Sequence, residues 1–168
     1  FAEWYGTIGR GSSSPTARAS LCFDSVNGFI VEAELEPMNI DERTLARRHI
    51  ENLSAVMPLD DAMFIFDRGY PDQKLFRFVQ SKGAKFLARV RAKYSLEIDD
   101  LPIDEKLEIG DHVIQLKSKD PKEEDLKVRV IKFRLPSGET EMLVTNEFDI
   151  ASDKFMDLYH DRWPIETE

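Results

Sequence analysis

The stretch that decides the fold is Ala62-Met63-Phe64-Ile65-Phe66-Asp67-Arg68-Gly69-Tyr70. Its uninterrupted apolar run at 62–66 has the length of a β-strand and is typical of a strand covered on both faces. Pro71 suits the first position of a helix, and an apolar stripe at 75–79 predicts that a helix follows the turn. The order of strand, tight turn and helix indicates an α/β fold. It places Asp67 at the carboxyl end of a buried strand, where open α/β sheets bind their ligands.

The residues before this stretch predict a β-hairpin and a helix. Segments 17–23 and 29–35 are rich in apolar and β-forming residues, and the Asn27-Gly28 pair between them is a strong hairpin signal. From 41 to 57 the apolar residues recur with helical periodicity, which predicts an amphipathic helix. A further strand is expected at 84–90.

The region from 92 to 141 has a different character. It is polar, charged and rich in turn residues, with strand candidates at 112–117, 126–135 and 141–145. Alternating, charge-rich strands suit a sheet with one solvated face, so we expect a β-rich subdomain that projects from the main sheet. Within 126–135 the apolar alternation slips phase after Val130, which predicts a β-bulge.

Composition excludes several classes of protein. The 168 residues are the size of one domain, and no stretch approaches the roughly 18 consecutive apolar residues of a membrane span. The net charge of -9 argues against attraction of the whole surface to phosphate, so any contact with nucleic acid must be local. The single cysteine, Cys22, excludes an internal disulfide and favours a cytosolic protein. Since Phe1 is not an initiator Met, we expect the chain to be a piece of a longer protein.

Asp67 and a group of residues near the C-terminus are the candidates for chemistry. Tyr159, Arg162 and Glu166 stand at i, i+3 and i+7, a spacing that places a hydroxyl, a cation and an acid on one face of a helix. Pro164 should kink or restart this helix. Simpler interpretations stay open. Asp67 then only begins a turn, and the helix is a surface helix with an Arg–Glu pair and Tyr159 in the core.

Two other reactive residue types are interpreted as structural. His49 falls on the apolar face of the helix at 41–57, which is typical of a buried, hydrogen-bonded histidine and not of a metal ligand. Cys22 lies in an apolar strand and is interpreted as a core residue and not as a nucleophile.

Two motifs together resemble a known family. Asp67-Arg68-Gly69-Tyr70 after an apolar strand, followed by Tyr-x-x-Arg-x-x-x-Glu at 159–166, looks like the DDE transposases of bacterial insertion sequences, in the branch named for its Tyr-Arg-Glu-Lys signature. The resemblance covers essentially all 168 residues, and Thr145-Asn146 also looks like family sequence.

This resemblance implies a fold. It is an α/β fold with a ribonuclease H-like mixed sheet flanked by helices, in which 92–141 is a β-rich insertion. Both hairpin strands and the strand ending before Asp67 should then share one mixed sheet, with the helix at 41–57 packed on it.

The resemblance also implies a role for each matched position. Asp67 and Glu166 would be the second and third carboxylates of a triad that holds two divalent metal ions, usually Mg²⁺. Such a pair of ions activates the attacking oxygen and stabilises the leaving oxygen in a phosphoryl displacement. Tyr159 and Arg162 would bind transposon-end DNA, with Arg68 as a weaker candidate for DNA contact.

The chain departs from the family pattern at both ends. Residues 1–23 contain no Asp, so the first catalytic Asp and its strand are expected to have been cut away. Asp24 lies between the hairpin strands and is interpreted as a turn residue. The signature Lys should come seven residues after Glu166, and the chain ends at Glu168. We therefore expect residues 1–168 to be a ribonuclease H-like transposase core that lacks its first strand.

These interpretations predict a fragment of a DNA transposase that is inactive on its own. Its intact parent would cleave DNA at transposon ends and join the ends to a target in a metal-dependent reaction. The partners would be double-stranded DNA and a second copy in a dimeric synaptic complex, in the bacterial cytoplasm and on the nucleoid when bound. Two alternatives stay open: a non-catalytic or domesticated transposase remnant that binds DNA or protein, and a nuclease of the same superfamily.

Overall fold

The computed structural model describes residues 16–118 and 120–162, which fall into two compact units. One unit extends to Met57 and the other runs from Pro58 to Arg162. In the described part of the chain, no helix has the length and apolar character needed to cross a membrane.

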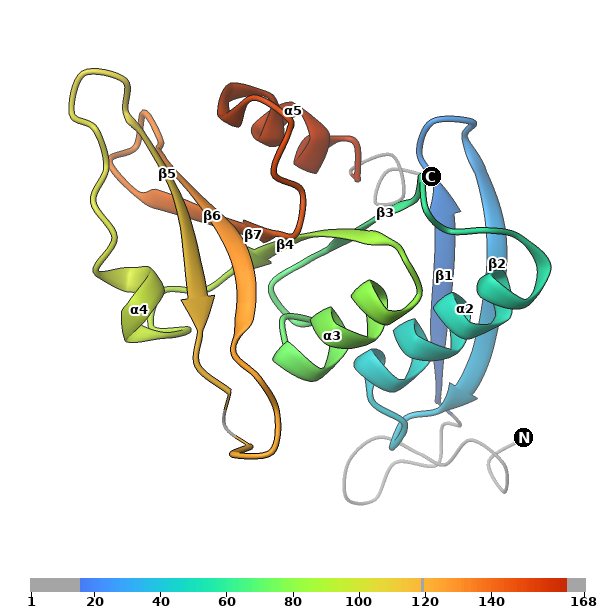
Figure 1. Cartoon of the computed structure of the whole chain (residues 1–168). Helices are drawn as coiled ribbons and strands as arrows, with labels where there is room; N and C mark the ends of the chain where they lie inside the picture. The colour runs from blue at the N-terminus through green and yellow to red at the C-terminus, as the bar shows by residue number, and fades with distance from the viewer. Residues whose placement is uncertain (1–15, 119, 163–168) are drawn as a thin grey trace, which may run out of the picture. The chain divides into compact units, whose positions relative to one another are not determined.

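The first unit contains a β-hairpin and one helix (Figure 1). Strands β1 (Ala17–Asp24) and β2 (Phe29–Pro37) pair antiparallel, as the hairpin signal predicted. In the turn, Gly28 adopts a φ of +72°, a conformation that favours glycine. The Asp24 carboxylate accepts hydrogen bonds from two backbone N–H groups of the same turn, both at 3.0 Å. Asp24 is thus the last residue of β1 and does not lie between the strands, but its side chain holds the turn.

Helix α2 (Glu42–Val56) follows the hairpin. Asp41 caps it, accepting hydrogen bonds from two backbone N–H groups of the first turn at 3.0 and 3.2 Å. The side chains of Leu45 and Ile50 are fully buried, in agreement with the predicted apolar face.

The second unit is built on a five-stranded mixed sheet with the strand order β3-β4-β7-β6-β5. Strands β3 and β4 are parallel, and every other neighbouring pair is antiparallel. In chain order its elements are β3 (Met63–Phe66), α3 (Gln73–Ser81), β4 (Lys85–Val90), α4 (Leu96–Asp99), β5 (Ile109–Leu116), β6 (Leu126–Arg134), β7 (Thr140–Thr145), the short 3₁₀ helix η1 (Ser152–Lys154) and α5 (Phe155–His160).

Helices α3 and α5 cover opposite faces of this sheet (Figure 1). Successive residues of β4 point to opposite faces. Phe86 stacks on Phe76 of α3 with ring centroids 4.2 Å apart, whereas Leu87 packs in a buried cluster with Phe155 and Tyr159 of α5. Full burial of each such side chain contributes about 2 to 3 kcal/mol. The predicted mixed sheet flanked by helices is confirmed.

The structure corrects the expectation that the hairpin belongs to this sheet. The hairpin forms a two-stranded sheet of its own, and among the described residues β3 pairs with β4 alone. The apolar composition of a strand reports what covers its two faces, but backbone hydrogen bonds at its edges leave no hydrophobic pattern. The run at 62–66 therefore could not show that β3 has one hydrogen-bonded neighbour among the described residues.

Residues 92–141 also lie differently from the expectation. They are rich in strand, as predicted, but β5 and β6 continue the sheet of β3 and β4 and do not project as a separate subdomain. Strand β7 pairs directly with β4, from Val90 opposite Met142 to Leu87 opposite Thr145. That the region is an insertion relative to the family core stays a prediction.

The predicted bulge in β6 is wrong. Strand β6 pairs with β5 and β7 in continuous register. Residues of both phases are buried, Val128 and Val130 on one face and Ile131 and Phe133 on the other. The slip in apolar alternation therefore marks a strand that is covered on both faces, which needs no extra residue.

Candidate functional site

Asp67 follows the last residue of β3 and begins the turn that leads into α3. The backbone N–H of Tyr70 donates to the Asp67 carbonyl at 3.0 Å, which closes the turn. The Asp67 side chain is partly buried. Because this side chain is short, its carboxylate stays close to the strand end that anchors it.

Tyr159 of α5 reaches this carboxylate. The Tyr159 hydroxyl donates to Asp67 Oδ1 at 2.9 Å, although 92 positions separate the two residues in the sequence. The ring belongs to the buried cluster beneath α5 and is only 1% exposed, so core packing fixes the position of the hydroxyl. The two motifs that the sequence singled out therefore meet at one point.

Two arginines flank the Tyr159 ring. The Cζ atoms of Arg162 and Arg89 lie 5.5 and 5.9 Å from the ring centroid, where a cation is attracted to the π-electrons of the ring. Arg89 of β4 also forms an ion pair with Glu141 of β7, with 2.8 Å between Nη2 and Oε2. Glu141 is only 7% exposed, so the carboxylate of this ion pair is shielded from water.

The surroundings shift two pKa values. Partial burial is the largest single influence on the pKa of Asp67 and acts to raise it. The hydrogen bonds from the Arg68 backbone and the Tyr159 hydroxyl, with the charges of the two arginines, outweigh burial and hold that pKa below the ordinary aspartate value. Burial, followed by the hydrogen bond to Asp67, raises the pKa of Tyr159. At neutral pH the carboxylate is therefore ionised and accepts, while the phenol is protonated and donates.

Three of the five predicted site residues come together in the structure: Asp67, Tyr159 and Arg162. Arg68 is exposed in the turn after Asp67. Glu166 lies outside the described residues, so its convergence with Asp67 stays a prediction.

Arg89 and Glu141 are the site residues that sequence reasoning missed. Each is a charged residue in a strand of mostly apolar residues, at 84–90 and 141–145. A charged residue among apolar strand residues could have indicated the ion pair, because a charge in a well-covered strand needs a partner.

Thr145 and Asn146, which looked like family sequence, hold the end of β4 in place. The Asn146 side chain accepts from the Phe86 N–H at 2.7 Å and donates to the Ala84 carbonyl at 3.1 Å. The Thr145 hydroxyl donates to the Phe86 carbonyl at 2.5 Å. Through these buried contacts both residues have a structural role: they fix β4, the strand that also contains Arg89.

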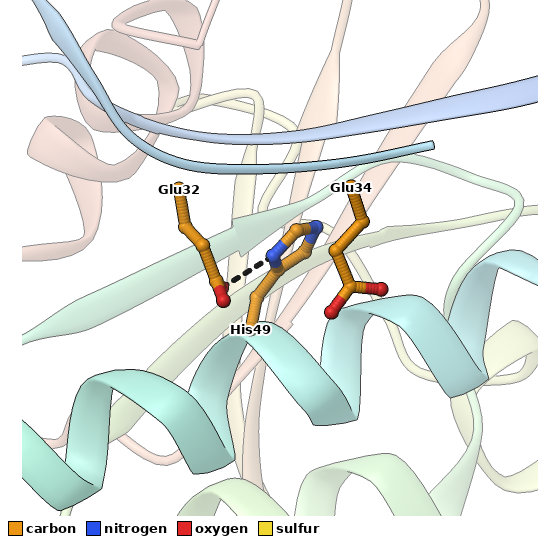
Figure 2. A group of neighbouring side chains, drawn as sticks. All are labelled: Glu32, Glu34 and His49. Carbon is orange, nitrogen blue, oxygen red and sulfur yellow. Dashed lines mark hydrogen bonds and ion pairs between the residues drawn. The ribbon is translucent and has the colours of Figure 1, made fainter. Parts of the chain in front are cut away.

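A second group of side chains with metal-binding chemistry lies in the first unit (Figure 2). One ligand atom from each of Glu32, Glu34 and His49 lies within 4.8 Å of the others, and the described residues contain one such group of three. In Figure 2 the two acids extend from β2 toward the imidazole of α2.

Each of these three side chains already has a hydrogen-bond or ion-pair partner in the structure. His49 Nδ1 lies 2.5 Å from Glu32 Oε2, and His49 Nε2 lies 2.8 Å from the Ser20 hydroxyl. The Asn52 amide donates to the other oxygen of Glu32, and Arg48 Nη1 lies 3.5 Å from Glu34. His49 is 4% exposed, so the interpretation of this residue as a buried, hydrogen-bonded histidine is confirmed.

Asp67 suits a divalent cation in the second unit. Hard cations such as Mg²⁺ prefer oxygen ligands, and the lowered pKa keeps the Asp67 carboxylate ionised. One carboxylate does not complete a metal centre, and the described residues contain no group of three potential ligands around it.

Comparison with known proteins identifies the family. The sequence profile of the Transposase DDE domain family matches residues 1–168. Among solved structures, the fold is similar to a chain in the cryo-EM structure of the piggyBac transposase synaptic complex with hairpin DNA, with a TM-score of 0.54 and 11% sequence identity. The similarity covers 95% of this chain and 34% of that one, so this chain spans about a third of its length. A search of curated proteins gave no match. Because the family profile covers the whole sequence, this chain belongs to the Transposase DDE domain family.

Proposed function

We propose that this chain is part of a DNA transposase that cleaves DNA at transposon ends and joins the ends to target DNA in a metal-dependent reaction. The observation that carries the proposal is the hydrogen bond between Tyr159 and Asp67, which joins both sequence motifs in a chain of this family. We place the first acid of the triad on a strand that precedes the hairpin in a longer protein. The isolated chain is then inactive because that acid is missing.

Asp67 and Glu166 are the proposed ligands of Mg²⁺, with two ions in the intact enzyme. When bound, the ions activate the attacking oxygen and stabilise the leaving oxygen of the phosphoryl displacement. The chain itself keeps Asp67 ionised and in place, through the Arg68 backbone N–H and the Tyr159 hydroxyl.

Double-stranded DNA is the proposed partner, and the similar solved structure is a transposase in complex with hairpin DNA. Arg162 lies beside the Tyr159 ring, and Arg68 is exposed next to Asp67, so both are proposed to bind phosphate near the acid. With a net charge of -9, contact with DNA depends on such local cations. A dimeric synaptic complex, in the cytoplasm and on the nucleoid, belongs to the same proposal.

Two substitutions in the full-length protein separate metal binding from DNA binding. Asp67→Asn removes a ligand charge and should abolish Mg²⁺-dependent strand cleavage while transposon-end binding stays unchanged. Arg162→Ala should weaken end binding and lower its salt dependence by about one phosphate contact. Asp100→Asn and Arg134→Ala are matched controls, because both residues are exposed elsewhere in the second unit.

Cleavage at the wild-type rate by Asp67→Asn would refute the assignment. End binding by the wild-type protein without Mg²⁺-dependent cleavage would identify a non-catalytic remnant that binds DNA or protein. Cleavage without preference for transposon ends would identify a nuclease of the same superfamily.

A further inference from the structure

We infer that Tyr159 is a positioning residue for Asp67, an inference that rests on the proposed function. In this role the phenol holds the Asp67 carboxylate for the metal, and contact with DNA is left to Arg162.

The first argument is the burial of the ring. Tyr159 is 1% exposed and packs with Leu87 and Phe155, so its ring cannot turn toward solvent without leaving the core. Its hydroxyl emerges from this core at the end of β3, 2.9 Å from Asp67 Oδ1. A side chain placed in this way presents one hydrogen-bond donor to one carboxylate.

The second argument is the support around the ring. Arg89 and Arg162 lie 5.9 and 5.5 Å from its centroid. Arg89 is itself held by the buried Glu141 at 2.8 Å. Residues from β4, β7 and α5 therefore set the position of the hydroxyl, and the hydroxyl sets the position of the carboxylate.

The chemical consequence concerns metal affinity. A hydrogen bond donated to a ligating carboxylate orients it and favours its ionised form. Loss of such an outer partner typically lowers metal affinity by about 10- to 100-fold. A tyrosine that only contacts DNA has no such effect in the absence of DNA.

Tyr159→Phe in the full-length protein tests the inference, because it removes the hydroxyl and keeps the buried ring. Calorimetric titration with Mn²⁺ in the absence of DNA should show binding at least about tenfold weaker than in wild type. Binding to transposon-end DNA in metal-free buffer should stay the same. Tyr94→Phe, which removes a phenol from the loop after β4, is the matched control, and thermal unfolding verifies that both variants fold.

The outcomes distinguish the inference from the proposed function. Unchanged Mn²⁺ affinity in Tyr159→Phe, with reduced affinity in Asp67→Asn, would overturn the inference and leave the function standing. Weaker end binding by Tyr159→Phe in metal-free buffer, with unchanged Mn²⁺ affinity, would assign the hydroxyl to DNA. Mn²⁺ affinity that Asp67→Asn does not alter would overturn both.

Discussion

Cys22 lies opposite Glu32 in the hairpin, and its environment disfavours the thiolate. Burial, followed by the charges of Glu32 and Asp24, raises the pKa of Cys22 to about 11. At pH 8 the thiolate fraction should be on the order of 100-fold lower than for an unperturbed thiol. Iodoacetamide should therefore alkylate the native chain far more slowly than the chain unfolded in guanidinium. Equal alkylation rates in the native and unfolded chains would contradict a raised pKa of Cys22 in the folded state.

Asp111 of β5 and Arg129 of β6 form a two-pronged ion pair. Arg129 donates from Nε to Oδ1 at 2.8 Å and from Nη2 to Oδ2 at 2.6 Å. The hydrogen bonding from Arg129 lowers the pKa of Asp111, and burial opposes it only in part. Because the folded-state pKa lies below the unfolded one, the stabilisation is fully present above the unfolded pKa. It is lost as pH falls through the folded pKa.

Asp111→Asn should accordingly lower the free energy of unfolding by about 1 to 2 kcal/mol at pH 7, since Arg129 keeps only a neutral partner. The difference from wild type should shrink as the pH falls below the ordinary aspartate pKa of about 4 and should vanish only once the pH has passed the lower folded-state pKa of Asp111. Urea unfolding at a series of pH values measures both effects, with Asp100→Asn as the control. A difference that is independent of pH would show that the ion pair contributes nothing.

The number of hydrogen-bonded neighbours of a strand affects its amide exchange. Strand β6 has hydrogen-bonded neighbours on both sides, whereas β3 is paired on one side among the described residues. We therefore expect slower exchange at 128–133 than at 63–66, measured by hydrogen exchange and mass spectrometry. The fully covered strand predicted at 62–66 and the solvated subdomain predicted at 92–141 would exchange in the reverse order. Equal protection of both strands would show that the second edge of β3 is paired as well.

Elements with local determinants were predictable. The Asn27-Gly28 pair predicted the hairpin, and the helical periodicity predicted α2. In the structure, Asp41 is the N-cap of this helix. Strand order was not predictable in the same way. Pairing of β7 between β4 and β6 depends on backbone hydrogen bonds between distant segments, which leave no mark in a single sequence.

The site was predictable to the extent that it rests on motifs. Asp67, Tyr159 and Arg162 were found from the spacing of two motifs, and the structure brings them together. Arg89 and Glu141 belong to no motif. Their ion pair becomes visible only when β4 and β7 are known to be neighbours.

At the scale of the whole molecule, the described residues offer two positions whose side chains suit a divalent metal. One is Asp67 in the second unit, and the other is the group of Glu32, Glu34 and His49 in the first. Our proposal places the catalytic metal at Asp67 because this residue lies where the two sequence motifs meet, whereas the hairpin group belongs to neither motif.

Iron-directed cleavage of the full-length protein tests this assignment most directly. Fe²⁺ that replaces Mg²⁺ at the site generates hydroxyl radicals with ascorbate and peroxide, and these cut the nearby backbone. We predict cuts near Asp67 and near Glu166, and the loss of both in Asp67→Asn. Cuts confined to the neighbourhood of Glu32 and His49, and unaffected by Asp67→Asn, would contradict the claim that Asp67 ligates the catalytic metal.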